Sequence, residues 1–232
     1  MRRAFFSLER RTMAQDRTAY DAKLESILRS AAVVFAAKGY HQASIRDIAR
    51  ASRVSLSGLY YYFQSKEELL FLIEDHALST LLAGLERLLV ETSDPLEKLR
   101  LLIGNHLRFF VQNMAEMKVL SHEAESLTGE FRTSVNAQKR RLTAIAMEIL
   151  REVEPRTDLD DRVSAFALFG MMNWLYAWYR PDRDVGVDRL VEDVTRLFLG
   201  GFLCDETLRG RILAPDAGVP KSPLANHRLI SG

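Results

Sequence analysis

The stretch from Val54 to Leu69 reads V-S-L-S-G-L-Y-Y-Y-F-Q-S-K-E-E-L and carries the most informative pattern in this chain of 232 residues. Ser55 can cap a short helix that runs to Tyr62, because a serine oxygen accepts hydrogen bonds from the N–H groups of a first helical turn. Leu59 and Phe63 are four residues apart and should face a core together. The pattern predicts a short capped helix with one buried face.

Two further helices are expected directly before this stretch. Between Tyr20 and Lys38 the apolar residues recur on one helical face, and Gly39 follows as a C-terminal stop. Ser44 begins S-I-R-D, a capping-box-like start with aspartate in place of glutamate, for a helix that ends near Ala51. The second and third helices are short and joined by a tight turn, which is the geometry of a helix-turn-helix.

Charge is distributed unevenly along the chain. The whole sequence has 32 Lys and Arg against 31 Asp and Glu, a formal net charge of +1. Residues 1–66 hold 12 of the basic and 5 of the acidic residues, a net of +7, so the remainder carries −6. A basic segment on a mildly acidic body indicates a polyanionic partner at one end of the chain.

The remaining apolar spacing stays helical, and no segment alternates with period two for long. The predicted fold is all-α, with an N-terminal three-helix bundle that contains the helix-turn-helix at 20–66 and a larger helical domain at 67–204. Residues 1–19 form a basic N-terminal arm, in which Met13 could be the true start, and 205–232 form a loose C-terminal tail. The later helices are expected over 65–90, 94–113, 118–127, 129–152, 158–178 and 187–203.

Several classes of protein are disfavoured. The sequence has no G-x-S-x-G elbow, no H-E-x-x-H and no glycine-rich phosphate loop, so an enzyme is not expected. The single cysteine, Cys204, excludes an internal disulfide framework and multi-cysteine zinc sites. No apolar run approaches the ~20 residues of a membrane span, so no membrane partner and a cytoplasmic setting are expected. No cofactor is expected either.

At the helix-turn-helix the sequence resembles the TetR family of transcriptional repressors, and the match covers about residues 20–70. The resemblance implies that the protein binds a palindromic double-stranded DNA operator as a homodimer and is released by a small effector. The residues that carry it are Phe35, Gly39, Ser44, Ile45, Ile48, Ala49, Val54, Ser57, Gly58, Leu59, Tyr60, Tyr61, Phe63, Ser65, Lys66, Leu69 and Leu70.

The candidate DNA-binding residues lie on or beside the two short helices. Arg46 matches a base-contacting position of the family, while Ser44 and Lys66 match phosphate contacts. Short hydroxyl side chains suit phosphates or base edges, tyrosines suit phosphates or thymine methyl groups, and a glycine permits close approach. The full set is Ser44, Arg46, Ser55, Leu56, Ser57, Gly58, Tyr60, Tyr61 and Lys66.

The segment from Gly170 to Pro181, G-M-M-N-W-L-Y-A-W-Y-R-P, looks similar to TetR-type regulators of fatty-acid or steroid degradation, whose effectors are acyl-CoA thioesters. An acyl chain needs apolar lining and a CoA phosphate needs cations. The candidate ligand-binding residues are Arg108, Phe109, Phe131, Met171, Asn173, Trp174, Trp178 and Arg180. Further lining candidates are Phe110, Met114, Met147 and Phe166, and further cations are Arg132, Lys139, Arg140 and Arg141.

Two alternatives remain open on the sequence. A TetR-type regulator of efflux would respond to drug-like hydrophobic ligands, and a non-specific polyanion-binding helical protein would show only salt-dependent binding that ignores sequence. The operator, the regulated genes, the identity of the effector and the choice between repression and activation are not given by the sequence.

Overall fold

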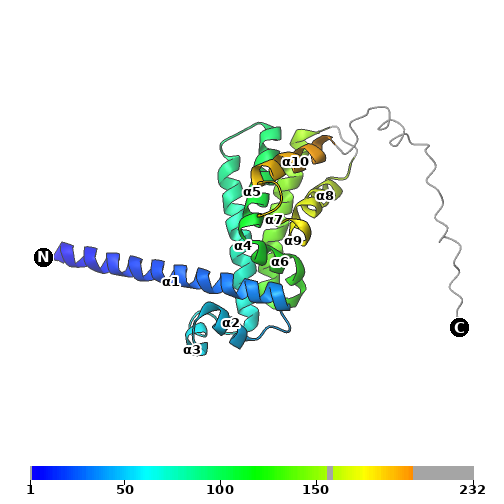
Figure 1. The fold of residues 1–232 in the computed structure, drawn as a ribbon. Helices are drawn as coiled ribbons and strands as arrows, with labels where there is room; N and C mark the ends of the chain where they lie inside the picture. The colour runs from blue at the N-terminus through cyan, green and yellow to red at the C-terminus, as the bar shows by residue number, and fades with distance from the viewer. Residues whose placement is uncertain (1, 156–158, 201–232) are drawn as a thin grey trace, which may run out of the picture. The chain divides into compact units, whose positions relative to one another are not determined.

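The computed structural model describes residues 2–155 and 159–200, and every regular element in those ranges is a helix (Figure 1). The predicted all-α class is confirmed. Residues up to Thr195 form one compact unit, to which the contacts below refer. The elements are α1 (Arg2–Lys38), α2 (Ile45–Ser52), α3 (Leu56–Leu59), α4 (Lys66–Leu89), α5 (Pro95–Gln112), α6 (Met114–His122), the 3-10 turn η1 (Ala124–Ser126), α7 (Gly129–Val153), α8 (Asp161–Asn173), α9 (Leu175–Trp178) and α10 (Val187–Gly200).

A small core joins α1, α2, α3 and the start of α4. Ile48 of α2 and Leu59 of α3 are fully buried, and Phe63 is 1% exposed. The helix ends are fixed locally, because Ser44, Ser55 and Ser65 each accept a hydrogen bond from a first-turn N–H group. The predicted three-helix arrangement with its buried Leu59 and Phe63 is therefore present.

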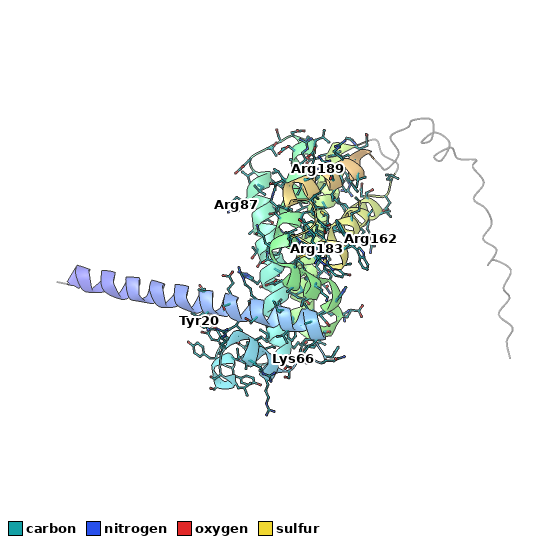
Figure 2. The ribbon with its side chains drawn as sticks, viewed as in Figure 1. Tyr20, Lys66, Arg87, Arg162, Arg183 and Arg189 are labelled. Atoms are coloured by element: carbon teal, nitrogen blue, oxygen red, sulfur yellow. The ribbon has the colours of Figure 1, made fainter. Side chains whose placement is uncertain are left out.

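Helix α4 is the continuous link between this small core and the rest of the unit. It has 24 residues and packs against α1, α5, α6 and α7 (Figure 1). Figure 2 shows Lys66 near α2 and α3, with Arg87 at the far end of the helix. Leu78 and Leu81 are buried on the inner face.

Two helices, α1 and α6, begin earlier than expected. The predicted N-terminal arm is not separate from the first helix, since α1 begins at Arg2; no glycine or proline precedes Gly39 to end a helix. The expected helix over 118–127 begins earlier, at Met114, and continues as the 3-10 turn η1. The expected tail at 205–232 lies outside the described residues.

The helix expected over 158–178 is interrupted at Trp174. Its backbone has φ −81° and ψ 0°, and the N–H of Ala177 donates to the carbonyl of Trp174 in a tighter turn. Met172 and Leu175, on either side of the break, are both fully buried. The interruption thus keeps both side chains in the core, a tertiary requirement that apolar spacing does not report.

No helix of the described chain is long and apolar enough to cross a membrane.

Candidate nucleic-acid interface and apolar cavity

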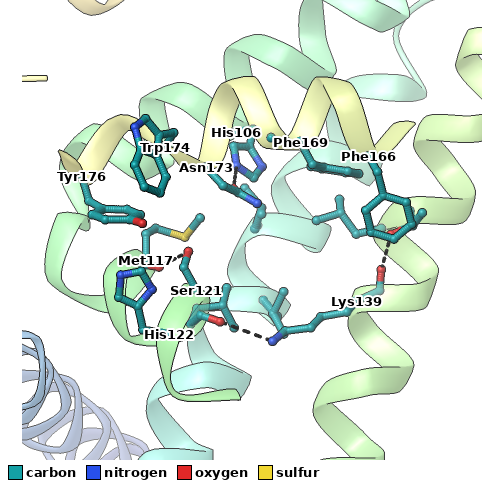
Figure 3. A pocket seen from close by; sticks show the side chains of 16 residues that line it. His106, Met117, Ser121, His122, Lys139, Phe166, Phe169, Asn173, Trp174 and Tyr176 are labelled. Carbon is teal, nitrogen blue, oxygen red and sulfur yellow. Dashed lines mark hydrogen bonds between the residues drawn. The ribbon is translucent and has the colours of Figure 1, made fainter. Parts of the chain in front are cut away.

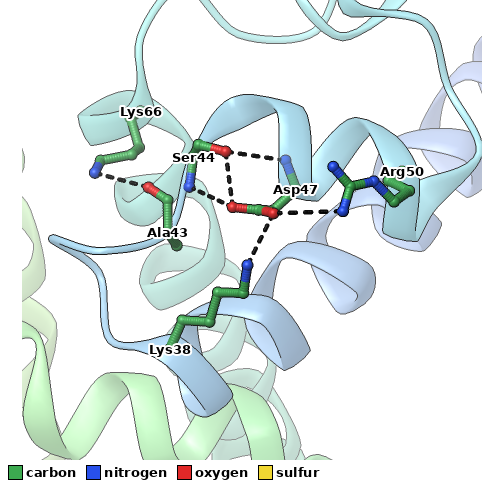
Figure 4. Close-up of polar contacts among 6 residues, drawn as sticks. All are labelled: Lys38, Ala43, Ser44, Asp47, Arg50 and Lys66. Carbon is green, nitrogen blue, oxygen red and sulfur yellow. Dashed lines mark hydrogen bonds and ion pairs between the residues drawn. The ribbon is translucent and has the colours of Figure 1, made fainter.

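The start of α2 is held by a reciprocal network around Ser44 and Asp47 (Figure 4). The backbone N–H of Asp47 donates to Ser44 Oγ at 3.2 Å, while the N–H and hydroxyl of Ser44 donate to Asp47 Oδ2 at 3.0 and 2.7 Å. Lys38 Nζ lies 2.8 Å from Asp47 Oδ1. The hydrogen bond from Lys38, followed by those from Ser44, holds the pKa of Asp47 far below its usual value. This network leaves Arg46 exposed on the outer face of α2.

The first turn of α3 leaves little room for a side chain at Gly58. Ser55 Oγ accepts the backbone N–H of Gly58 at 3.1 Å and lies 3.2 Å from the hydroxyl of Ser57. A Cβ on Gly58 would lie 2.9 Å from a methyl group of Val54 and 3.1 Å from Ser55 Oγ. Gly58 therefore has a packing role in the cap, in addition to any close approach to a ligand.

The third helix is shorter than expected, since α3 ends at Leu59 and not at Tyr62, and the tyrosines that follow it differ in exposure. Tyr60 is 52% exposed and Tyr61 is 72% exposed, and Leu56 at the start of α3 is also exposed. Tyr62 turns inward and stacks on Tyr20 of α1 at 4.9 Å between ring centroids. Arg46 of α2 is exposed as well, so the exposed side chains of the two short helices are available to a groove-reading helix-turn-helix.

The ammonium group of Lys66 is already engaged by several contacts within the protein. Its ammonium donates to the carbonyls of Tyr40, His41 and Ala43 at 2.9, 3.3 and 3.1 Å. The same Nζ lies 4.4 Å from the centroid of the Tyr40 ring. Lys66 thus ties the start of α4 to the loop between α1 and α2, and a phosphate would compete with those carbonyls. Its predicted DNA contact, like the others on this surface, stays a prediction.

A second site is a cavity of about 600 Å³ on the inner side of α4 (Figure 3). Its size falls within the range of small-molecule sites, and most of its wall is apolar. Polar groups enter it at a few points only. The lining residues are Leu78, Leu81, His106, Met117, Leu120, Ser121, His122, Lys139, Leu142, Thr143, Phe166, Phe169, Gly170, Asn173, Trp174 and Tyr176.

One wall of the cavity carries a buried histidine–amide pair. His106 Nε2 lies 2.8 Å from Asn173 Oδ1, and Nδ1 of the same ring has no hydrogen-bond partner among the described residues. Burial lowers the pKa of His106 to about 4, although the hydrogen bond with Asn173 acts in the opposite direction. The imidazole is therefore neutral at pH 7 and offers one unused ring nitrogen.

The opposite wall carries Lys139, which approaches a buried carboxylate. Lys139 Nζ donates to the carbonyl of Leu120 at 3.3 Å and lies 3.8 Å from Oε2 of Glu74 (Figure 3 shows the lysine). Glu74 is fully buried, and burial raises its pKa to about 7, with Lys139 lowering it and Glu123 raising it. Burial also lowers the pKa of Lys139, while Glu74 raises it. The pair is poorly solvated and sensitive to a third charged group.

The structure brings two of the eight predicted ligand-binding residues, Asn173 and Trp174, to this cavity. Arg108 instead pairs with Asp188 of α10 at 2.9 Å, and Phe131 stacks on Phe71 at 4.6 Å between ring centroids. Six predicted residues do not line this cavity, namely Arg108, Phe109, Phe131, Met171, Trp178 and Arg180. The sequence reasoning missed Leu78 and Leu81, because nothing local marks which apolar residues of a core helix border a cavity.

An exposed apolar stripe runs along α8 and α9, and two of its members, Phe166 and Trp174, also line the cavity. Its members recur at helical spacing, which is unusual on a surface that faces water. Their exposed fractions lie between 37% and 66%. The large side chains of this stripe are Val163, Phe166, Met171, Trp174 and Trp178.

A capped helix-turn-helix, joined by one helix to an apolar cavity, defines the chain as a helical DNA-binding regulator with a ligand site. The chain belongs to the TetR family of transcriptional regulators. Residues 27–73 match the description "Bacterial regulatory proteins, tetR family", and residues 92–202 match "Tetracyclin repressor-like, C-terminal domain". The family and its relatives are regulators and not enzymes, as the sequence predicts.

The chain is similar to the following three proteins, among others. The transcriptional repressor KstR2 of Mycobacterium tuberculosis is 28% identical over 76% of this chain and 90% of its own length. The fatty acid metabolism regulator protein of Bacillus subtilis is 26% identical over 78% of this chain and 95% of its own. The crystal structure of AibR with isovaleryl coenzyme A and operator DNA superposes with a TM-score of 0.68 at 27% identity, covering 75% of this chain and 97% of that one.

Proposed function

We propose that the protein is a repressor that binds a palindromic operator as a homodimer and is released by an acyl-CoA thioester linked to lipid or steroid degradation. The observation that carries the proposal is the single helix α4, which joins the exposed helix-turn-helix surface to the apolar cavity. An effector that prefers one position of α4 shifts the population of the DNA-competent state.

The DNA-binding part is assigned to residues 20–66 and the ligand-binding and dimerisation part to 67–204. Arg46 and the exposed tyrosines 60 and 61 are assigned to base edges and backbone in the major groove. Ser44, Ser55 and Ser57 sit at helix starts, where N–H groups and hydroxyls suit phosphate oxygens. Leu56 is assigned to an apolar base edge, and Gly58 to close approach.

The homodimer is assigned to the exposed stripe on α8 and α9. A stripe of this kind is stabilised when a second copy covers it, and a two-fold axis through it places the same residues on both sides. Two recognition helices then face half-sites one or more helical turns apart. Trp174 belongs both to this stripe and to the cavity, so dimer and effector sites are adjacent.

The acyl-CoA assignment is supported by relatives and by the cavity together. The B. subtilis relative is named for fatty acid metabolism, and AibR was crystallised with an acyl coenzyme A and operator DNA. An apolar cavity of about 600 Å³ suits an acyl group, which gains roughly 25 cal/mol for each Å² of apolar surface removed from water.

The test is a competition between effector and operator. Purified protein is mixed with labelled DNA from upstream of its own gene, and acyl-CoAs of different chain length, free fatty acids and free CoA are added in turn. Release by one acyl-CoA class supports the proposal. Release by drug-like hydrophobic compounds and by no acyl-CoA would favour a regulator of efflux instead.

A further inference from the structure

Behind the cavity lining, next to Lys139, lies a buried carboxylate that accepts no hydrogen bond within the described residues. Glu74 lies on α4, is 0% exposed, and neither of its carboxylate oxygens has a hydrogen-bond partner in the described chain. A buried carboxylate without donors is strongly destabilised unless a cation or a proton neutralises it. The ammonium of Lys139, 3.8 Å away, is too distant for a hydrogen bond but close enough for attraction.

Lys139 also faces the cavity. Among the described residues that line it, Lys139 is the one lysine and none is an arginine. The other titratable groups near the pair are Glu123 at the end of α6 and the lining residues His106 and His122. Glu123 is acidic and raises the pKa of Glu74, so the arrival of a further anion beside Glu74 is still less favourable.

We propose that Lys139 binds the anionic head of an apolar effector and that Glu74, deprived of its cation, takes up one proton from solvent. The proposal rests on the function proposed above and adds the chemistry that the cavity recognises. The head group is an anionic oxygen group on an apolar chain, either the carboxylate of a free acid or a phosphate of a CoA thioester.

The proton uptake follows from charge balance around a buried carboxylate. Before binding, one ammonium faces one carboxylate; after binding, the same ammonium faces two anions. Pairing with the effector leaves Glu74 buried and uncompensated, and the least costly response is formation of its O–H bond. Binding of one anion is therefore accompanied by uptake of one proton, and no other bond changes.

The position of Glu74 links this event to the DNA-binding surface. Glu74 lies eight residues after Lys66 on the same helix, which corresponds to about 12 Å along the axis. Lys66 ties that helix to the loop before α2. Loss of the Glu74–Lys139 attraction removes one of the contacts that hold α4 against α7.

The experiment measures heat of binding and proton uptake for decanoate, decanol and decanoyl-CoA, in two buffers of different ionisation enthalpy at pH 8 and pH 7. For the wild type we expect decanoate to bind more tightly than decanol, with nearly one proton taken up at pH 8 and about half as many near pH 7. Decanoyl-CoA, compared with decanoate, shows which of the two anionic groups reaches Lys139.

Two substitutions and a matched control locate the effect. Glu74→Gln keeps the side-chain size, abolishes the proton uptake and strengthens decanoate binding at pH 8 by up to about tenfold, because Lys139 no longer has a competitor. Lys139→Met removes the preference for decanoate over decanol. Glu86→Gln, which breaks the exposed ion pair between Glu86 of α4 and Arg141 of α7, leaves uptake and preference unchanged.

The outcomes separate this inference from the proposed function. Equal affinity of the wild type for decanoate and decanol, or proton uptake that persists in Glu74→Gln, overturns the role of the pair. If Lys139→Met does not fold, Glu74→Gln alone decides. Coupled binding of the anion and a proton that leaves the operator complex intact supports the inference and contradicts the proposed release of DNA.

Discussion

Lys66 Nζ lies over the ring of Tyr40, 4.4 Å from its centroid, and donates to the carbonyl of the same residue at 2.9 Å. Lys66 and Tyr40 thereby join the start of α4 to the loop before α2. We predict that Lys66→Met lowers the free energy of unfolding by about 2 kcal/mol, the scale of charge-assisted hydrogen bonds, and weakens binding to all DNA sequences alike. Thermal melting and binding to operator and random DNA measure both effects, with the exposed Lys23→Met as control. Unchanged melting with weaker binding would assign Lys66 to phosphate alone.

Arg46 should carry sequence preference and little stability, because its side chain is exposed on the outer face of α2. We predict that Arg46→Ala leaves the melting temperature unchanged and relaxes discrimination at one base pair by about 1–3 kcal/mol. Competition between operator variants with single base changes measures this. An equal loss for every variant would make Arg46 a backbone contact.

Acid should weaken the start of α2 through Asp47. Lys38 and Ser44 depress the pKa of this carboxyl in the folded state, so its contribution is complete above the unfolded value of about 3.9 and is lost as pH falls below it. We predict that wild type is more stable than Asp47→Asn at pH 6 and that the difference shrinks toward pH 2. Urea unfolding across that range measures it, with the exposed Glu148→Gln as control. A difference independent of pH would contradict the ion pair.

His106 should also make the protein sensitive to acid, in a different window. Burial lowers its pKa to about 4, so the unfolded chain binds more protons below the ordinary value of about 6.5. We predict that wild type loses about 3 kcal/mol relative to His106→Gln as pH falls from 7 to 4. His76→Gln, which removes an exposed histidine, is the control substitution. Parallel stability curves for His106→Gln and wild type would show that the histidine is not buried in solution.

The exposed stripe on α8 and α9 should be a dimer interface. We predict that Met171→Asp and Trp178→Asp, which do not line the cavity, convert the protein to a monomer and weaken operator binding, because one half-site remains. Light scattering at micromolar concentration measures the mass. Val90→Asp replaces an apolar residue that is 87% exposed outside the stripe and should stay dimeric. A monomeric wild type would contradict the assignment.

Short-range signals explain what the sequence predicted well. Ser44, Ser55 and Ser65 cap helices through hydrogen bonds to residues three positions away, so each cap is visible in a few letters. The burial of Leu59 and Phe63 follows from helical spacing for the same reason.

Contacts between distant residues explain what was missed. The break in the helix at Trp174 allows residues on both sides of it to be buried. Lys66 donates hydrogen bonds to the carbonyls of residues more than twenty positions earlier. Leu78 and Leu81 reach the cavity from a helix whose apolar face gives no sign of a cavity. Arg108, chosen for its charge, is engaged by Asp188. Such pairings depend on how helices pack and are not encoded in local spacing.

The most direct test of a sequence-specific repressor that an acyl-CoA releases is the fluorescence anisotropy of labelled upstream DNA. The DNA is titrated with protein and then with acyl-CoA at fixed salt. We expect the protein to bind its operator at least ~10³-fold more tightly than random DNA and to be released by an acyl-CoA of suitable length. Affinity equal to that for random DNA over a panel of upstream fragments, falling with salt in the same way, would contradict a sequence-specific repressor.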